Sequence, residues 1–128
     1  MEPTLPTSNL VKPFLTDMYQ VSMSYAYWKN GHHEDPSVFD CFFRKCPFKG
    51  EFTIFAGLDE VLKFVSTWKI SEEEIAFVEK MIPNVEPGFI EWLRAADTSQ
   101  IKIYAIEEGS VVFPKVPLVR VEGPLAIA

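Results

Sequence analysis

The stretch FLTDMYQVSMSYAYWKNG, residues 14–31, predicts the element around which the rest of the fold is built. Asp17 followed by Gln20 is a capping-box pattern, and Gly31 is a typical stop, so we expect a helix over residues 17–30. At spacings of three and four residues, one apolar face carries Met18, Val21, Tyr25 and Trp28, and another carries Tyr19, Met23 and Ala26. A helix that is apolar on two faces is expected to be covered on both, by its own domain and a partner or by two layers of one domain.

The remaining sequence predicts two short strands, three further helices and a block of strands. Alternation and turn residues predict strands at 38–44 and 52–55, and later at 101–106, 111–113 and 118–123. Apolar periodicity predicts helices that begin after Gly57, Ser71 and Pro87. Helices and strands that are segregated along the chain are typical of an α+β fold.

Local patterns add detail to several of these elements. Ser71 and Glu74 form a second capping-box pattern. The strand at 38–44 would place Val38, Asp40, Phe42 and Arg44 on one face. Because two of these residues are charged, we expect this face to meet a polar site rather than a dry core. Pro114 and Pro117 predict a sheet edge or a bend. The apolar stripe of the second helix is interpreted as core and consists of Leu58, Val61, Leu62, Val65 and Trp68.

The domain organisation predicted from the sequence is simple. Residues 1–13 contain three prolines and no periodicity, which predicts a flexible tail, and residues 14–128 are enough for one α+β domain. The apolar run at 123–128 has neither cap nor turn signal and is interpreted as the first residues of an unpaired strand. We therefore expect a domain truncated at its C-terminal strand block, as in a fragment, a short product or a shortened chain.

Composition excludes some classes of function. The net charge is −6, and no run of Lys or Arg is present, so the electrostatic footprint of a nucleic-acid or anionic-membrane binder is missing. The sequence shows no signal peptide and no apolar stretch of membrane-spanning length, which predicts a cytosolic protein. Cys41 and Cys46 are interpreted as free thiols, because five positions along one strand would point them to opposite faces.

Few residues combine in a pattern that carries chemistry. No glycine-rich phosphate loop, zinc signature or serine elbow is found, and no metal site is predicted. His32 and His33 are interpreted as solvated turn residues, and the acidic run at 72–74 as a solvated first helical turn. The sequence contains three candidate binding residues, each with a structural alternative: Asp17 as a cap, Tyr19 as core, and Arg44 as an ion-pair partner of Asp40.

Longer motifs carry a resemblance to a known family. The segments LTDMYQ (15–20), YWKNG (27–31), FFRKCPF (42–48) and FTIFAGL (52–58) resemble the N-terminal part of eukaryotic-type nicotinate phosphoribosyltransferases. The later segments EGS (108–110), FP (113–114), VPL (116–118) and VEGPL (121–125) continue the match. The resemblance covers nearly the whole chain after the tail. It implies the N-terminal helical and mixed-sheet domain of the nicotinate/quinolinate phosphoribosyltransferase type, without the barrel domain that follows it.

The resemblance also implies an activity and a set of roles. Enzymes of this family form nicotinate mononucleotide from nicotinate and phosphoribosyl pyrophosphate, with ATP hydrolysis and Mg²⁺, and act as homodimers. Tyr19 matches the tyrosine that stacks on the pyridine ring from the neighbouring subunit, and Asp17 lies at the same corner. Arg44 lies at the position of the family's strand arginine, which makes it a candidate contact to substrate phosphates. Lys45 is a weaker candidate, because alternation would turn its side chain to the other side of the strand.

The catalytic groups of this family lie in the barrel domain. Neither His32 nor His33 matches the phosphorylated histidine, so no catalytic residue is assigned in this chain. The resemblance therefore implies that the 128-residue chain is inactive alone. The alternatives are a short non-catalytic interaction module that docks on the full-length enzyme, and an unstable truncation without function. The groups that discriminate nicotinate from nicotinamide lie outside this sequence.

Overall fold

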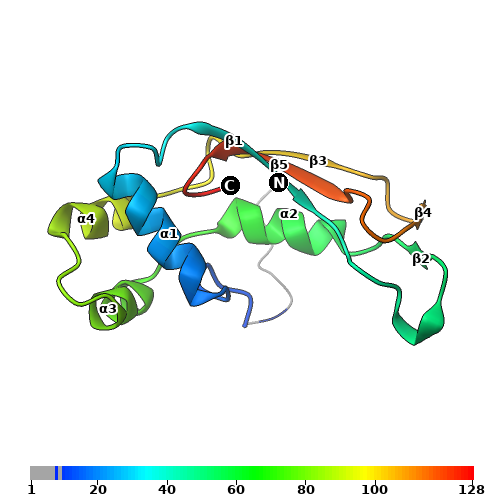
Figure 1. Ribbon diagram of the computed structural model, residues 1–128, viewed down its shortest axis with the longest axis horizontal. Coiled ribbons are helices and arrows are strands. Elements are labelled where there is room, and N and C mark those ends of the chain that lie inside the picture. The colour runs from blue at the N-terminus through cyan, green and yellow to red at the C-terminus, as the bar shows by residue number, and fades with distance from the viewer. Residues whose placement is uncertain (1–7, 9) are drawn as a thin grey trace.

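The computed structural model describes residues 8 and 10–128, so most of the predicted tail at 1–13 lies outside the described residues. The predicted α+β class is confirmed. Figure 1 shows α1, α3 and α4 together at one end, α2 below the larger sheet, and β2 and β4 at the other end. The helices are α1 (Met18–Lys29), α2 (Leu58–Thr67), α3 (Glu72–Met81) and α4 (Pro87–Ala95), with a short 3₁₀ helix η1 (Pro47–Lys49). The strands are β1 (Pro36–Cys41), β2 (Thr53–Ile54), β3 (Lys102–Ala105), β4 (Val111–Val112) and β5 (Val119–Pro124).

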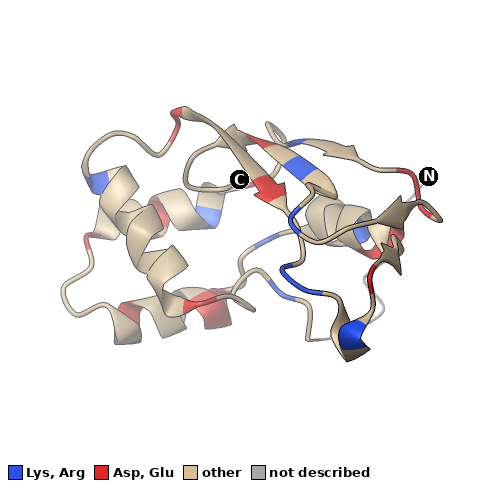
Figure 2. Ribbon diagram, turned by 45° about the vertical axis from the view of Figure 1, so that its right-hand side comes forward, with Lys and Arg blue, Asp and Glu red and all other residues tan. Residues whose placement is uncertain are grey.

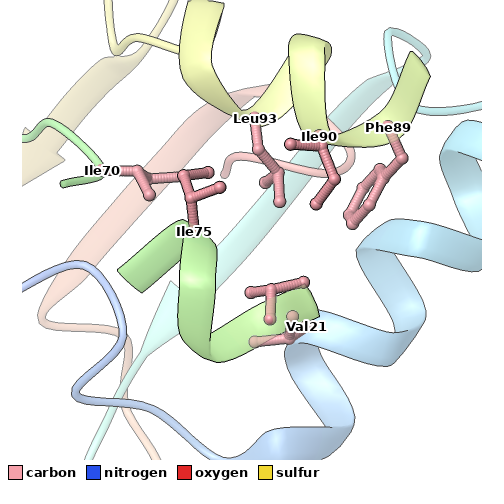
Figure 3. Close-up of a cluster of buried hydrophobic side chains, with 7 residues drawn as sticks. Val21, Ile70, Ile75, Phe89, Ile90 and Leu93 are labelled. Carbon is pink, nitrogen blue, oxygen red and sulfur yellow. The ribbon is translucent and has the colours of Figure 1, made fainter. Parts of the chain in front are cut away.

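A hydrophobic cluster joins α1, α3 and α4. Phe89 of α4 is fully buried, and Ile75 and Val78 of α3 are each 1% exposed. Figure 3 shows Phe89, Ile90 and Leu93 of α4 facing Val21 and Ile75 across this core. The buried members of the cluster are Val21, Ile70, Ile75, Val78, Phe89, Ile90 and Leu93. Burial of this kind supplies most of the stability of short helices, because helices of about ten residues are marginal in water.

An ion pair at the protein surface also links α1 to the start of α4. Lys29 Nζ at the end of α1 lies 2.6 Å from Glu86 Oε1, which precedes α4. The hydrogen bond from Lys29 lowers the pKa of Glu86, and the same bond raises the pKa of Lys29. Both side chains are exposed, so water screens the pair and it contributes little to stability compared with the buried cluster.

The larger sheet is antiparallel, with the last strand in its centre. Its order is β1-β5-β3, and β2 pairs separately with β4. Asp40 of β1 lies opposite Arg120 of β5, which in turn lies opposite Tyr104 of β3. Pro114 and Pro117 lie in the bend between β4 and β5, as predicted. The amide of Lys115 within this bend donates to the carbonyl of Phe43 at 2.8 Å.

The apolar stripe of α2 was predicted to be core, and the structure confirms this only at the two ends of the stripe, where Leu58 and Trp68 pack against hydrophobic clusters. No residue of α2 is buried, and Val61 and Leu62 are 37% and 46% exposed. The second cluster lies instead beside the sheet, and its buried members are Phe55, Val112 and Val119. Leu58 at the start of α2 packs against this cluster. Periodicity predicted the helix and its apolar face correctly, but it could not show whether this chain covers that face.

The bounds of all five predicted strands differ from the structure, and those of β1 differ most. β1 begins at Pro36 and ends at Cys41, rather than running from Val38 to Arg44. Beyond it, the Phe43 carbonyl accepts from Lys115 in the bend between β4 and β5. Residues 125–128 form a turn rather than the first residues of an unpaired strand. The Leu125 amide donates to Asp35 O at 2.9 Å, and the Ala126 amide donates to His33 O at 3.1 Å.

The cysteines agree with the prediction, and the histidines agree in part. Cys41 and Cys46 are both free. His32 is exposed and its Nδ1 lies 2.8 Å from Asp35 Oδ2. His33 is not the solvated turn residue that was predicted, since its ring lies edge-on to Trp92 with centroids 5.4 Å apart. No helix among the described residues is long and apolar enough to cross a membrane.

Candidate functional site

The first turn of α1 carries two of the predicted binding residues, Asp17 and Tyr19. The predicted capping box is present, and Gln20 Oε1 accepts a hydrogen bond from the Asp17 amide at 3.2 Å. Tyr19 is 59% exposed, so the alternative that it belongs to the core is wrong. The first buried residue of α1 is Val21. The first turn of α1, which carries Tyr19, is therefore exposed in this chain.

Only one of the two apolar faces of α1 is covered by this chain. Tyr25 and Trp28 pack on Phe89, with ring centroids 4.9 Å and 5.8 Å apart. Tyr19 and Met23, on the other face, are 59% and 44% exposed. The possibility that two layers of the same domain cover the helix does not hold in the described structure. The described chain therefore leaves the face that begins with Tyr19 uncovered.

Arg44 and Lys45 lie in the loop that connects β1 to η1, and both are exposed. The alternative in which Arg44 pairs with Asp40 is not found among the described ion pairs. Asp40 lies opposite Arg120, whose Nη2 is 2.6 Å from Glu122 Oε1. Since β1 has ended before this loop, strand alternation does not separate Arg44 from Lys45. Guanidinium and ammonium groups in an exposed loop can contact phosphate.

The charged face of the larger sheet was predicted to meet a polar site. Val38, Glu122 and Lys102 lie side by side in the register, next to the row that contains Asp40 and Arg120. Figure 2 shows acidic and basic positions interleaved across these strands. Residues of opposite charge are neighbours on this face, and a hollow of about 380 Å³ is lined by Val38, Lys102 and Glu122. Whether this face meets a polar site stays a prediction.

The structure does not bring the predicted site residues together. Figure 1 places α1 at the helical end of the molecule, whereas the loop from β1 to η1 lies toward the end that contains β2 and β4. Within one copy of this chain, Asp17 and Tyr19 therefore form one candidate region, and Arg44 and Lys45 form another. Neither region is a complete active site. Three or more His, Cys, Asp or Glu side chains do not gather anywhere in the described part of the chain to hold a metal ion.

One contact of the segment before α1 had no signal in the sequence. Glu74 was predicted to cap α3, and its Oε2 does accept from the Ser71 amide at 2.9 Å. Its other oxygen, Oε1, accepts from the amide of Phe14 at 3.1 Å, a residue 60 positions earlier and three before Asp17. A capping-box pattern reports only a local bond. The long-range bond could not be predicted, because its donor is a backbone amide, which every residue except proline has.

A small hollow lies behind the same helix. Its volume is about 160 Å³, and it is bounded by Gln20 and Ser24 of α1 and by aromatic side chains from two other elements, Trp68 and Trp92. Ser24 Oγ also donates to the Ala126 carbonyl at 2.9 Å. The hollow is on the core side of α1, so it is separate from the exposed face that carries Tyr19.

Comparisons with known proteins match almost the whole chain. The family described as the nicotinate phosphoribosyltransferase (NAPRTase) N-terminal domain matches residues 14–128. Nicotinate phosphoribosyltransferase 2 of Arabidopsis thaliana is 55% identical over 122 residues, which are 95% of this chain and 22% of that protein. The enzyme of Caenorhabditis elegans is 56% identical over 120 residues, 93% of this chain and 21% of that protein.

A solved structure shows the same fold. The crystal structure of human nicotinic acid phosphoribosyltransferase superposes with a TM-score of 0.79 at 40% identity, and the match covers 89% of this chain and 23% of that chain. The chain thus spans about a fifth of the length of the curated relatives that it matches.

Proposed function

The chain belongs to the family of nicotinate phosphoribosyltransferase N-terminal domains, and we therefore propose that it is the N-terminal part of an enzyme that makes nicotinate mononucleotide. In this reaction the ring nitrogen of nicotinate displaces pyrophosphate from phosphoribosyl pyrophosphate. ATP hydrolysis drives the reaction, and Mg²⁺ assists it. The observation that carries the proposal is the exposed Tyr19 ring at the capped start of α1, within the sequence segment that resembles the family's stacking motif.

Within this proposal, residues 14–128 are the N-terminal α+β domain, as the boundaries of the family match support, and residues 1–13 are a tail. The exposed Tyr19 face serves the active site of a second subunit in a homodimer. This arrangement accounts for the separation of Tyr19 from Arg44 in one chain, because the two residues then need not serve the same site. Asp17 contacts nicotinate beside Tyr19, and Arg44, with Lys45, contacts a substrate phosphate.

The remaining catalytic groups belong, in this proposal, to the part of the enzyme outside this chain. In this proposal ATP and Mg²⁺ serve the full enzyme, and neither is assigned to residues of this segment. A cytosolic location is part of the proposal, because two free cysteines suit a reducing compartment.

We expect the 128-residue chain alone to form no nicotinate mononucleotide above a control without protein, because it carries no nucleophile or catalytic histidine of the family. Product can be measured by liquid chromatography after incubation with nicotinate, phosphoribosyl pyrophosphate, ATP and Mg²⁺. Transfer at a rate above the control would contradict the assignment. The alternative function, a short interaction module, would also be inactive, so this assay does not separate the two. A coding sequence that continues into a barrel domain would favour the enzyme.

Replacing Tyr19 by alanine in the full-length enzyme is expected to raise the KM for nicotinate by about two- to tenfold, since an aromatic stack contributes about 0.5 to 1.5 kcal/mol beyond area burial. Tyr19→Phe should retain most of the affinity, because the ring is kept. Tyr104→Ala is a matched control, because Tyr104 lies on the sheet and its exposed fraction, 54%, is similar to that of Tyr19. Steady-state kinetics check this, and an unchanged KM and kcat in Tyr19→Ala would remove the stacking role.

A further inference from the structure

Glu74 divides its two carboxylate oxygens between two elements that are far apart in the sequence. Oε2 accepts from both the amide and the hydroxyl of Ser71, at 2.9 Å and 2.8 Å, and so closes the first turn of α3. Oε1 accepts from the Phe14 amide at 3.1 Å, in a partly buried position. The first set of bonds is local helix capping, whereas the second attaches the segment before α1 to α3.

The attached segment leads directly into the turn that presents Tyr19. Phe14 packs its ring against the helical cluster, and the Leu15 amide donates to the Lys12 carbonyl at 3.0 Å, which closes a turn around Phe14. Only Leu15 and Thr16 separate Phe14 from Asp17, where the capping box begins. With Phe14 held on both its ring and its backbone, little conformational freedom remains before Asp17.

The first turn of α1 needs this support because it is not held by burial. Met18, Tyr19 and Gln20 are all exposed, and the first buried residue is Val21. The ends of helices fray unless caps or flanking segments hold them. The position of the Tyr19 ring therefore depends on the capping box and on the segment that Glu74 holds.

We propose that Glu74 is a positioning residue for nicotinate: through the Phe14 amide it fixes where α1 begins and thereby the place and direction of the Tyr19 ring. The inference rests on the proposed stacking role of Tyr19. Glu74 does not touch the substrate. A mispositioned ring weakens ground-state binding more than the chemical step, so the effect of its loss lies in the KM for nicotinate.

The test uses the full-length enzyme with Glu74→Ala, Glu74→Gln and Ser71→Ala. Glu74→Ala is expected to raise the KM for nicotinate by about two- to tenfold, the range for a lost hydrogen bond, with little change in kcat or in the KM for phosphoribosyl pyrophosphate. Glu74→Gln retains an acceptor for the Phe14 amide and should restore most of the affinity. Ser71→Ala weakens the same helix cap but leaves the Phe14 bond, so it should lower the Tm and leave the KM unchanged.

A structural readout accompanies the kinetics. In the 128-residue chain, hydrogen exchange of the Phe14 amide should accelerate in Glu74→Ala and not in Ser71→Ala. If Glu74→Ala does not fold, Glu74→Asp, which shortens the reach to Phe14 and can still cap α3, replaces it and should raise the KM in the same direction.

Three outcomes would overturn the inference. A KM for nicotinate that rises in Tyr19→Ala but not in the Glu74 variants would remove the role of Glu74 and leave the proposed function intact. An equal rise in Ser71→Ala would show that helix stability alone is involved. No rise in Tyr19→Ala would remove the stacking role, and with it the nicotinate role of Glu74.

Discussion

Replacing Phe89 by alanine should lower the free energy of unfolding by about 3 to 5 kcal/mol, the largest effect expected from any single substitution in the helical cluster. Phe89 is fully buried, and three aromatic rings surround it, with centroids 4.9 Å from Tyr25, 5.8 Å from Trp28 and 5.6 Å from Trp92. Removal of the ring loses its transfer free energy and leaves a cavity that rigid aromatic neighbours fill poorly.

Urea unfolding followed by tryptophan fluorescence measures this loss directly. Phe77→Ala on α3 is the matched control, because Phe77 is 50% exposed and its truncation should cost about 1 kcal/mol or less. A loss in Phe89→Ala no larger than that in Phe77→Ala would mean that the cluster of α1, α3 and α4 does not pack as described. If Tyr19 stacks on nicotinate as proposed, the Phe89 variant should also lose nicotinate affinity in the full-length enzyme, because Phe89 packs against α1.

Replacing Val112 by aspartate should cost about 3 kcal/mol or more, because it places an unpaired carboxylate in the second cluster. Val112 is 3% exposed and packs with Phe55 and Val119. The neighbouring residue of the same strand, Val111, is 54% exposed and points to the opposite face. Val111→Asp should therefore cost about 1 kcal/mol or less, mainly through the low strand propensity of aspartate.

The two aspartate variants differ only in the face of β4 that carries the new charge. Thermal unfolding followed by circular dichroism compares them, and equal Tm values would contradict the burial of Val112. The pH dependence gives a second check. A buried carboxyl group has a raised pKa, so the cost of Val112→Asp should shrink as the pH falls and the group becomes neutral, whereas the cost of Val111→Asp should change little.

Local signals in the sequence predicted most of the elements. Both capping boxes are present, at the starts of α1 and α3, because such boxes depend on side chains only three residues apart. Among the described residues, the four helices and five strands lie within a few residues of the positions that periodicity and turn residues predicted, and four of the strands are shorter than expected. The end of β1 was missed, since it depends on hydrogen bonds to the bend between β4 and β5, which is distant in sequence.

The candidate site was predicted to a smaller extent. The motif that contains Asp17 and Tyr19 could be recognised from residue order alone, but spacing left Tyr19 equally suited to a core. The exposed fraction of 59% decided between these alternatives. The positions of Arg44 and Lys45 were not predicted correctly, because the alternation argument assumed a strand that runs to residue 44, whereas β1 ends at Cys41. Glu74 was recognised as a cap, and its second contact, to Phe14, was not foreseen.

The sequence by itself determined the α1 helix, its caps and its two apolar faces, because these follow from interactions between residues three or four positions apart. Only the tertiary structure decided which face the domain covers. The helical cluster takes the face of Val21, Tyr25 and Trp28, since these side chains meet Phe89 from α4. The face of Tyr19 is left exposed in this chain, and Glu74 of α3 binds the Phe14 amide of the segment before α1. Contacts between residues so far apart in sequence depend on how the elements pack.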